Sequence, residues 1–378
     1  MSGSEEITPF RIAIPEADLD NLRQRLHDAR WPDELPDAGW DYGIPLRETQ
    51  DLATYWRDGY DWRAWEARLN AFPQYQTVID GQNVHFLHVR SPEPGAMPLL
   101  LTHGWPGSIV EFIDLIGPLT DPRAHGGDPA DAFHIVSPSI PGFTFSGPTH
   151  ERGWDVRRIA VAWQVLMERL GYDRYGAQGG DWGSAISRDL GLVAPAHVIG
   201  VHLNYLRISP PAEAIPLRPG EAERIEKLRQ YNASVPGYIG IQATKPQTLA
   251  YGLTDSPTGQ LAWIAEKFHA WSDPRTPVDR DHLLTNVSLY WFTRTAGSSA
   301  RIYYESARGR GVPNPCPVPM GVAVFPHDIL QPVRSFAERV YDIRHWREFD
   351  RGGHFAALEV PDLLTDDIRA FFRQFRTQ

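Results

Sequence analysis

The chain has 378 residues, of which 42% are hydrophobic and 11% aromatic, and such a composition buries a large core and excludes a mainly disordered chain. Its formal net charge of −10 argues against nucleic acid or an anionic membrane as a partner, because both attract a positive field. The single cysteine, Cys316, excludes an internal disulfide and a metal site built from several thiolates. We see no basic, apolar leader before Phe10 and no run of about 18 apolar residues, so we expect a cytoplasmic protein.

The first 74 residues predict a helical extension that is rich in aromatic side chains. Leu19, Leu22 and Leu26 recur at the spacing of one helix face, and residues 52–69 repeat this pattern with tyrosine and tryptophan. A segment this short cannot build a core alone. We therefore expect residues 1–74 to dock on the rest of the chain.

Strands and helices alternate from Tyr75 onward, which predicts a parallel sheet with helices on both faces. Asp80 and Gly81 mark a hairpin between the first two strands. The expected strands are residues 76–79, 84–89, 99–102, 133–136, 174–178, 198–203, 321–325 and 341–349. The main expected helices are residues 155–170, 222–231, 258–271 and 279–293, together with helices that begin at Gly183 and near Pro361.

This alternation is interrupted once. Residues 206–310 predict a block of helices inserted into the α/β pattern, which resumes afterwards. We therefore expect an α/β core formed by residues 75–205 and 311–378, with a helical lid at residues 206–310.

The string GGDWGS at positions 179–184 lies between a predicted strand and a predicted helix. This context is that of a nucleophile elbow, G-x-S-x-G, with Asp181 in place of the serine. Glycines flank such a residue because the turn is sharp and its backbone is strained. An aspartate is ionised at neutral pH, so it can attack carbon without an activating base and leave an ester. The alternative is a glycine-rich turn in which Asp181 only caps a helix.

The string HGWPG at positions 103–107 follows a short apolar strand. In a fold with such an elbow, the loop after this strand supplies one backbone N–H to the oxyanion hole, and the residue after the nucleophile supplies the other. The N–H groups of Trp105 and Trp182 are therefore the candidate donors. We interpret His103 as a structural histidine of the loop.

A histidine and an aspartate near the C-terminus complete a nucleophile–acid–base order. His354 lies on a glycine-flanked loop after the last predicted strand, which suits a base. Asp328 follows an earlier apolar strand and would orient His354 and stabilise its imidazolium form. Asp350 is the competing acid, but it lies very near His354 in sequence, and His327 is interpreted as a bystander.

The strings GGDWGS, HGWPG and RGGHFAALE (residues 351–359), together with the aromatic extension, resemble the microsomal-type epoxide hydrolases of the α/β-hydrolase superfamily. The resemblance covers nearly the whole chain and implies the α/β-hydrolase fold with an N-terminal segment that many relatives lack. Membrane-bound members carry an N-terminal anchor helix, which this chain lacks, so we expect a soluble bacterial or fungal member. We expect no cofactor and no metal, and a homodimer stays open because relatives often form one.

The resemblance also implies two lid tyrosines that bind the epoxide oxygen. Tyr238, shortly before the string TKP, matches the first of them by local context. Tyr303 in the string RIYYE matches the second, with Tyr304 as its rival. A phenol suits this task because it is a neutral donor near pH 7 and can protonate an alkoxide as it develops.

The expected reaction opens an apolar epoxide, which could carry an aryl group, to a vicinal diol, with the epoxide and water as its small-molecule partners. Asp181 attacks an epoxide carbon while Tyr238 and Tyr303 polarise and protonate the oxygen. His354, oriented by Asp328, then activates a water that hydrolyses the ester on Asp181.

We expect aromatic side chains to exclude bulk water from this site. The candidates for the substrate-binding wall are Trp105, Phe143, Trp182 and Tyr304, although plain core packing explains Phe143 almost as well.

Three alternatives stay open. A haloalkane dehalogenase shares the fold and the aspartate nucleophile, but it needs no acid, so the lid tyrosines decide between the two classes. The extension and the string HGWPG favour the epoxide interpretation. An esterase or peptidase needs a serine at the elbow, whereas Ser184 follows the elbow position by three residues. A non-catalytic protein that binds a ligand under the lid would not need the nucleophile, acid and base together.

Overall fold

The computed structural model describes residues 6–233, 236–309 and 315–376. These residues form a nine-stranded sheet in the order β1-β2-β3-β5-β4-β6-β7-β8-β9. The pairs on the β1 side, up to β3–β5, are antiparallel, and the pairs from β4–β5 to β8–β9 are parallel. The strands are β1 (Thr8–Phe10), β2 (Gln74–Ile79), β3 (Gln82–Val89), β4 (Met97–Thr102), β5 (Phe133–Pro138), β6 (Tyr175–Gly179), β7 (Val198–Leu203), β8 (Met320–Val324) and β9 (Ile343–Glu348).

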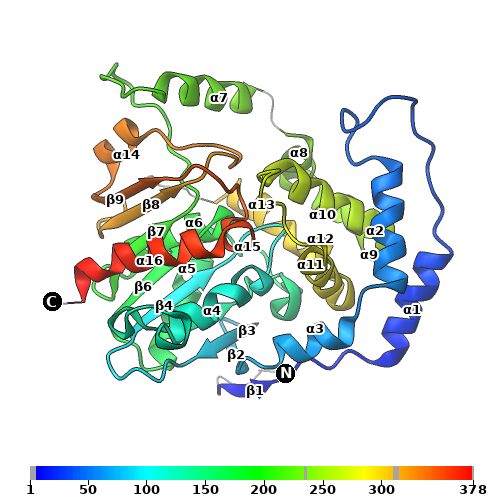
Figure 1. Ribbon diagram of the computed structural model, residues 1–378, viewed down its shortest axis with the longest axis horizontal. Coiled ribbons are helices and arrows are strands. Elements are labelled where there is room, and N and C mark those ends of the chain that lie inside the picture. Colours follow the sequence, from blue (N-terminus) through cyan, green and yellow to red (C-terminus); the bar gives the residue numbers. More distant parts are fainter. Residues whose placement is uncertain (1–5, 234–235, 310–314, 377–378) are drawn as a thin grey trace.

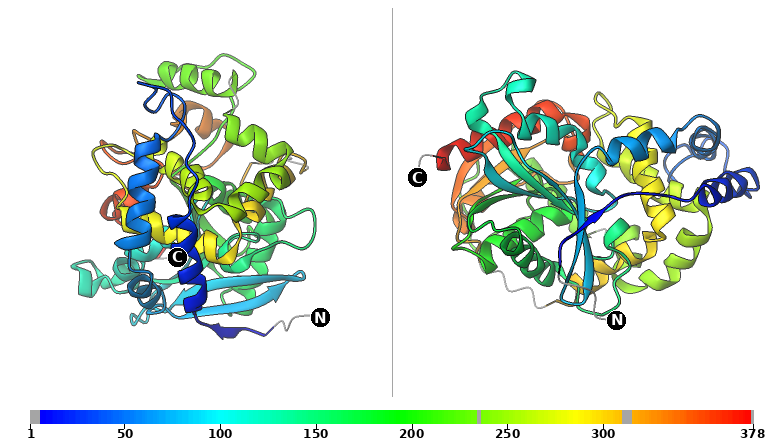
Figure 2. Two further views of the ribbon diagram at one scale, coloured as in Figure 1. Left: turned by 90° about the vertical axis from the view of Figure 1, so that its right-hand side faces the viewer. Right: turned by 90° about the horizontal axis from the view of Figure 1, so that it is seen from below.

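Helices cover both faces of this sheet, as predicted (Figure 1 and Figure 2). On one face α6 packs on β4, β6 and β7, and on the other α16 packs on β7, β8 and β9. The helices of the core are α4 (Ile113–Thr120), α5 (Val156–Arg169), α6 (Asp181–Val193), α14 (Arg334–Val340), α15 (Ala356–Glu359) and α16 (Pro361–Phe372). Short 3₁₀ segments lie at Ile109–Phe112, Arg123–His125, Pro129–Asp131, Thr144–Ser146 and Arg373–Phe375.

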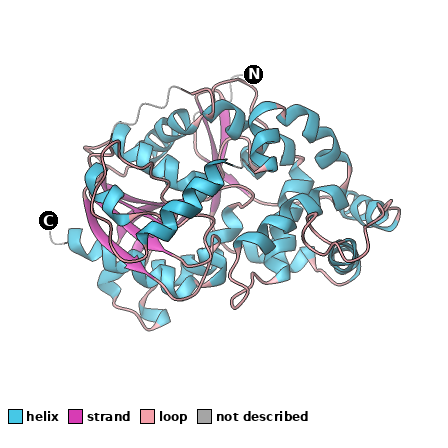
Figure 3. Cartoon of the chain, turned by 90° about the horizontal axis from the view of Figure 1, so that it is seen from above, coloured by secondary structure: helices cyan, strands magenta, loops and turns pink. Residues whose placement is uncertain are grey.

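A block of helices between β7 and β8 lies beside the sheet. Figure 3 shows the strands in one half of the molecule and helices alone in the other. The helices of the block between β7 and β8 are α7 (Glu221–Ala233), α8 (Gly237–Thr244), α9 (Pro246–Asp255), α10 (Pro257–Trp271), α11 (Arg280–Thr293), α12 (Ala296–Ser299) and α13 (Arg301–Ser306). The predicted boundary between lid and core at 310/311 lies outside the described residues, as do residues 1–5 of the predicted extension. Nowhere in the described ranges does a helix combine the length and the apolar composition needed to cross a membrane.

The N-terminal helices α1 (Glu16–His27), α2 (Leu46–Asp58) and α3 (Trp62–Leu69) dock on this helical block. In the left view of Figure 2 they stand in front of it. The buried indole of Trp56 donates a 2.9 Å hydrogen bond to the Ser288 hydroxyl of α11. The Tyr55 hydroxyl donates to Asp281 of the same helix at 2.8 Å. Aromatic residues of the N-terminal segment therefore contact this helical block.

Two local features differ in their predictability. The hairpin turn at Asp80 and Gly81 is confirmed, because both residues have the positive φ values, 50° and 74°, that a two-residue turn with a right-handed twist requires. Strand β1 was not predicted. Its three residues lie at the edge of the sheet and pair with β2, so long-range pairing, rather than an apolar pattern, makes them a strand.

The sheet register brings the motif-bearing loops together. Thr102 at the end of β4 pairs with Gly179 at the end of β6. Leu203 of β7 pairs with Val322 of β8, which runs parallel to β9. The carboxyl ends of parallel strands meet at one edge of a sheet. The loops after β4, β6, β8 and β9 therefore emerge side by side.

One buried carboxylate ties α16 to the sheet. Asp367 accepts hydrogen bonds from His202 of β7 at 2.9 Å and from His345 of β9 at 2.8 Å. Burial opposes its charge, but the two imidazoles prevail and lower the pKa of Asp367 to about 2. The carboxylate therefore stabilises the fold fully above its ordinary pKa, and this stabilisation is lost as the pH falls toward 2.

We expect the substitution Asp367→Asn to lower the free energy of unfolding by about 2 kcal/mol at pH 7, because the buried His202 and the partly buried His345 lose a charged acceptor. Urea denaturation at pH 7 and pH 3 measures this difference, which should be smaller at pH 3. Asp366→Asn, at the exposed neighbour of Asp367, serves as the control and should change stability little. An equal loss for both variants would contradict the role given to Asp367.

Candidate active site

Asp181 lies at the bend between β6 and α6. It is the first residue of α6. The sequence predicted that this helix begins at Gly183, and this prediction was wrong because the helix already includes Asp181. Its φ of 47° is left-handed, a strained conformation for a residue with a side chain. A Cβ on Gly179 would lie 2.2 Å from the carbonyl oxygen of Gly183, so bulk is excluded there. The turn presents the carboxylate at a helix N-terminus, where the dipole favours negative charge.

The two oxygens of the Asp181 carboxylate face different partners. Oδ1 accepts a 2.8 Å hydrogen bond from the backbone N–H of Trp105. Oδ2 lies 3.4 Å from Nε2 of His354. A Cβ on Gly104 would lie 2.4 Å from Oδ1, so the loop approaches this closely only with glycine at that position. Trp182 is the second residue of α6, and its N–H belongs to the first turn, whose donors have no partner within the helix.

His354 and Asp328 form a buried pair. Nδ1 of His354 lies 2.6 Å from Oδ1 of Asp328, which also accepts the Ile329 N–H at 2.7 Å. A bridge between His327 and Gly353 joins the two loops that carry the pair. The competing acid, Asp350, has a side chain that is 90% exposed and lies 4.0 Å from Arg351. The geometry therefore favours Asp328 as the partner of His354.

The imidazole of His354 lies between two carboxylates. Burial disfavours its charged form, but the charge of Asp328 and hydrogen bonds to Asp181 and Asp328 prevail and raise its pKa to about 10. With Asp181 ionised, His354 is therefore an imidazolium at neutral pH. Loss of the Asp181 charge removes part of this stabilisation and makes the ring a better base.

Tyr238 of α8 and Tyr303 of α13 face the same space. Their ring centroids are 6.0 Å apart, and each ring packs on Trp105, at 5.4 Å and 5.7 Å respectively. Burial, aided by the charge of Asp181, raises the pKa of both phenols well above 10. Both hydroxyls thus stay protonated and able to donate.

Tyr304 lies elsewhere. Its ring packs under the guanidinium of Arg308, with the carbon 3.6 Å from the ring centroid. Tyr303 packs instead on Trp182, with the centroids 4.8 Å apart. Of the two tyrosines, Tyr303 therefore lies against the elbow residue Trp182, whereas Tyr304 lies against Arg308. Phe143 is fully buried against His103 and Tyr290, which is a core position.

His103 has the structural surroundings expected of it. It is fully buried; Nε2 accepts the Ile140 N–H at 3.2 Å, and Nδ1 lies 3.0 Å from the Gly104 carbonyl oxygen. Burial lowers the pKa of His103 to about 4, so the ring is neutral. Ser184 donates its hydroxyl to the Asp181 carbonyl oxygen at 2.6 Å. Neither side chain is arranged as a nucleophile or base.

Two aromatic residues of the site have no motif in the sequence. Trp271, the last residue of α10, packs on His354 with centroids 5.2 Å apart and on Tyr238 at 5.4 Å. Tyr205, just after β7, packs on His354 at 5.5 Å. The sequence predicted only that a helix ends at residue 271, whereas the fold brings the Trp271 ring to His354.

Comparisons with known proteins find relatives of nearly the whole chain. Residues 7–112 match the family model described as the epoxide hydrolase N terminus, and residues 97–236 match that of the alpha/beta hydrolase fold. A protein of Stigmatella aurantiaca assigned as an epoxide hydrolase is 47% identical over 98% of this chain and 86% of its own length. Epoxide hydrolase 1 of Sus scrofa is 35% identical over 97% of this chain and 88% of its own.

Solved structures give the same result. The Aspergillus niger epoxide hydrolase is 34% identical and superposes with a TM-score of 0.88, covering 99% of this chain and 97% of its own. The juvenile hormone epoxide hydrolase of Bombyx mori is 31% identical with a TM-score of 0.90, covering 99% of this chain and 96% of its own.

A mostly parallel sheet, an aspartate at the elbow after β6 and a histidine after the last strand define an α/β-hydrolase. Within that superfamily, the similarity over almost the full length shows that the chain belongs to the epoxide hydrolases. The predicted fold and family are both confirmed.

Proposed function

We propose that the enzyme hydrolyses an apolar epoxide to a vicinal diol through a covalent ester on Asp181. One observation carries the proposal: the two oxygens of the Asp181 carboxylate have different partners. Oδ1 lies 2.8 Å from the backbone nitrogen of Trp105, and Oδ2 lies 3.4 Å from the His354 imidazole. Oδ2 is then the oxygen that attacks carbon, and Oδ1 is already seated at an oxyanion donor.

The buried aromatic rings around Asp181 support an apolar substrate. Trp105, Tyr238 and Tyr303 are each at most 9% exposed and pack on one another. Together with Trp182 and Trp271 they leave few polar groups to bind a hydrophilic molecule. Flat indole and phenol rings suit an aryl-substituted epoxide in particular.

In the first half-reaction, Oδ2 of Asp181 forms a bond to one epoxide carbon while the bond from that carbon to the ring oxygen breaks. The oxygen takes a proton from one of the two phenols, Tyr238 or Tyr303, which share its negative charge as it develops. The product is a hydroxyalkyl ester and a phenolate. The ester lacks the negative charge that stabilised the proton on His354. This proton can therefore pass to the phenolate, which leaves the tyrosine protonated and His354 neutral.

In the second half-reaction, neutral His354 takes a proton from water while the water oxygen attacks the ester carbonyl carbon. Asp328 stabilises the imidazolium that forms. Oδ1 becomes the oxyanion and is held by the N–H groups of Trp105 and Trp182, each contributing about 3 kcal/mol of transition-state stabilisation. The diol oxygen then leaves with the proton of the imidazolium, and the acid on Asp181 passes its proton to His354, which restores the starting state.

The double substitution Tyr238→Phe and Tyr303→Phe tests the role of the phenols. We expect it to lower epoxide turnover by roughly 10²–10⁴-fold, because no acid remains to protonate the ring oxygen. Styrene oxide consumption measures the loss. A dehalogenase needs no such acid, so halide release from a bromoalkane would be unaffected in a protein of that alternative class.

Tyr251→Phe is the matched control, because this tyrosine also lies in the lid but is 72% exposed. It should turn over styrene oxide like the unmodified enzyme. Unchanged epoxide turnover in the double variant would refute the assignment of the two phenols.

A further inference from the structure

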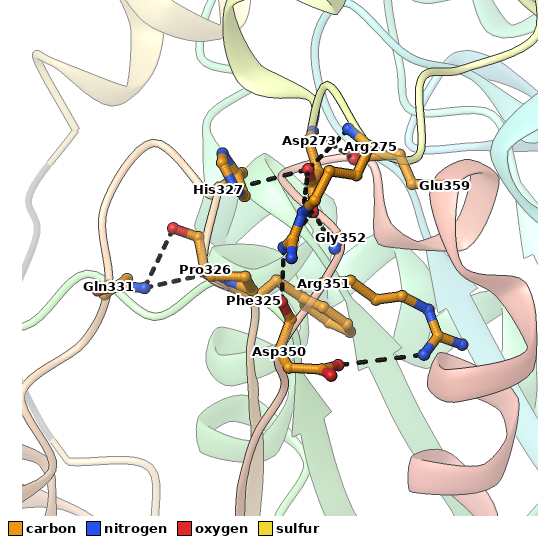
Figure 4. Close-up of polar contacts among 10 residues, drawn as sticks. All are labelled: Asp273, Arg275, Phe325, Pro326, His327, Gln331, Asp350, Arg351, Gly352 and Glu359. Atoms are coloured by element: carbon orange, nitrogen blue, oxygen red, sulfur yellow. Dashed lines mark hydrogen bonds and ion pairs between the residues drawn. The ribbon is translucent and has the colours of Figure 1, made fainter.

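The loop that carries His354 is held by the lid. The backbone N–H of His354 donates to the carbonyl oxygen of Trp271 at 2.9 Å. Two residues earlier, the N–H of Gly352 donates to Oδ2 of Asp273 at 2.9 Å (Figure 4). The lid segment 271–273 therefore anchors the backbone of the base at two points.

The carboxylate of Glu359 in α15 also links the His354 loop to the segment 271–273. Its Oε1 accepts the N–H of Phe355, the residue after His354, at 2.9 Å. Its Oε2 accepts the N–H of Asp273 at 2.7 Å. The side chain is almost completely buried, so no water replaces either bond at low cost.

Asp273 is itself rigidly held. Its side chain is fully buried and accepts bonds from Nε and Nη2 of Arg275, the latter at 2.8 Å. Arg275 also donates to the carbonyl oxygen of Asp350, just before the His354 loop (Figure 4). Nε2 of His327, the neighbour of Asp328, lies 3.5 Å from Oδ1 of Asp273. The cluster thus touches the loops of both the base and its acid.

The same lid segment also sets one wall of the site. The Trp271 ring packs on His354, Tyr238 and Trp105, with centroid distances of 5.2, 5.4 and 6.4 Å. A shift of this segment would therefore move the base and the substrate wall together.

We infer that Glu359 is a positioning residue for ester hydrolysis: its carboxylate bridges the Phe355 and Asp273 N–H groups and so holds His354 in line with the ester on Asp181. This inference rests on the proposed function, because it concerns the second half-reaction only. Attack by Asp181 on the epoxide needs the elbow and the phenols, whereas activation of water needs the imidazole at a defined place. A displacement of the imidazole by about 1 Å can lower the rate of ester hydrolysis roughly 100-fold. A glutamine cannot replace Glu359, because it has one acceptor oxygen and its NH₂ would face a second N–H donor.

The test separates the two half-reactions in the full-length enzyme. Burial raises the pKa of Glu359 to about 7, so assays at pH 8.5 keep it ionised. Rapid quenching followed by intact-protein mass spectrometry measures how fast the styrene oxide adduct forms and disappears. We expect Glu359→Gln to leave adduct formation within about twofold and to slow adduct hydrolysis by roughly 100-fold.

Glu221→Gln is a matched control. Glu221 is also buried and also accepts two backbone N–H groups, from Arg218 and Ser335, at 2.8 Å each. Its substitution should cost comparable thermal stability without changing either half-reaction.

Arg275→Ala provides a second variant that does not remove a buried carboxylate, because the Arg275 side chain is 58% exposed. It loosens Asp273 and should slow adduct hydrolysis in the same selective way, by a smaller factor.

The outcomes distinguish this inference from the proposed function. If the unmodified enzyme forms no adduct, the covalent mechanism itself fails. If the adduct forms but Glu359→Gln hydrolyses it at the normal rate, or slows both half-reactions equally, the positioning role is refuted. If Glu359→Gln does not fold, a normal rate of adduct hydrolysis in Arg275→Ala refutes it as well.

Discussion

Substitution of Asp181 by alanine is expected to lower diol formation by roughly 10⁴-fold or more, because it removes the atom that forms the bond to carbon. The helix N-terminus, the Trp105 N–H and the two phenols would all remain, but none of them can attack an epoxide. The variant should fold, since alanine removes only the carboxylate, with its hydrogen bond from Trp105 and its contact with His354. Chiral chromatography of the diol from styrene oxide measures the effect, with the thermal melting curve as the check on folding.

Asp350→Ala is the matched control for this substitution, because the Asp350 side chain is 90% exposed although it lies near the same loop. It should retain normal turnover. A single turnover of the unmodified enzyme in heavy-oxygen water gives an independent readout: the label should enter the Asp181 carboxylate and not the first diol. Full activity in Asp181→Ala, or label in the first diol, would show that water opens the epoxide directly.

Substitution of His354 by glutamine is expected to separate the two halves of the reaction. The Asp181 carboxylate and the two phenols remain in place, so the ester still forms. Its hydrolysis should slow by roughly 10²–10⁴-fold, because no base is left to take the proton from water. Intact-protein mass spectrometry should then show the enzyme heavier by one epoxide, with steady-state turnover falling to the rate of hydrolysis.

His125→Gln is the control, since His125 is an exposed surface histidine. It should show neither adduct accumulation nor loss of turnover. If His354→Gln turned over normally without accumulating ester, the base would have to be another group. If it formed no ester at all, His354 would be required before attack, contrary to the order of steps proposed here.

Much of the site could be predicted from short strings of residues. Asp181 has a positive φ at a sharp bend, and the glycines around it and in the string HGWPG lie where a Cβ would have no room. Alternating strands and helices then imply a parallel sheet, and such a sheet brings its loops together at one edge. The order of Asp181, Asp328 and His354 along the chain therefore predicted a pairing that the structure brings within hydrogen-bond distance.

The lid was less predictable. Tyr303 and Tyr304 are neighbours on α13, and consecutive side chains on a helix point about 100° apart. Which of the two faces Asp181 depends on how α13 packs, and a local string carries no information on that. In the structure Tyr303 packs on Trp182, while Tyr304 packs on Arg308.

Chain order and local chemistry were thus sufficient to predict the fold class and the family, because both depend on residues adjacent in sequence or on the regular order of strands. The same information predicted that Asp181, Asp328 and His354 would lie together, as they do. The second phenol, the Trp271 wall and the bridge from Glu359 to Asp273 became visible only in three dimensions. The bridge from Glu359 to Asp273 alone joins residues that lie 86 positions apart, and no local rule of conformation or charge dictates which buried partners such distant segments choose.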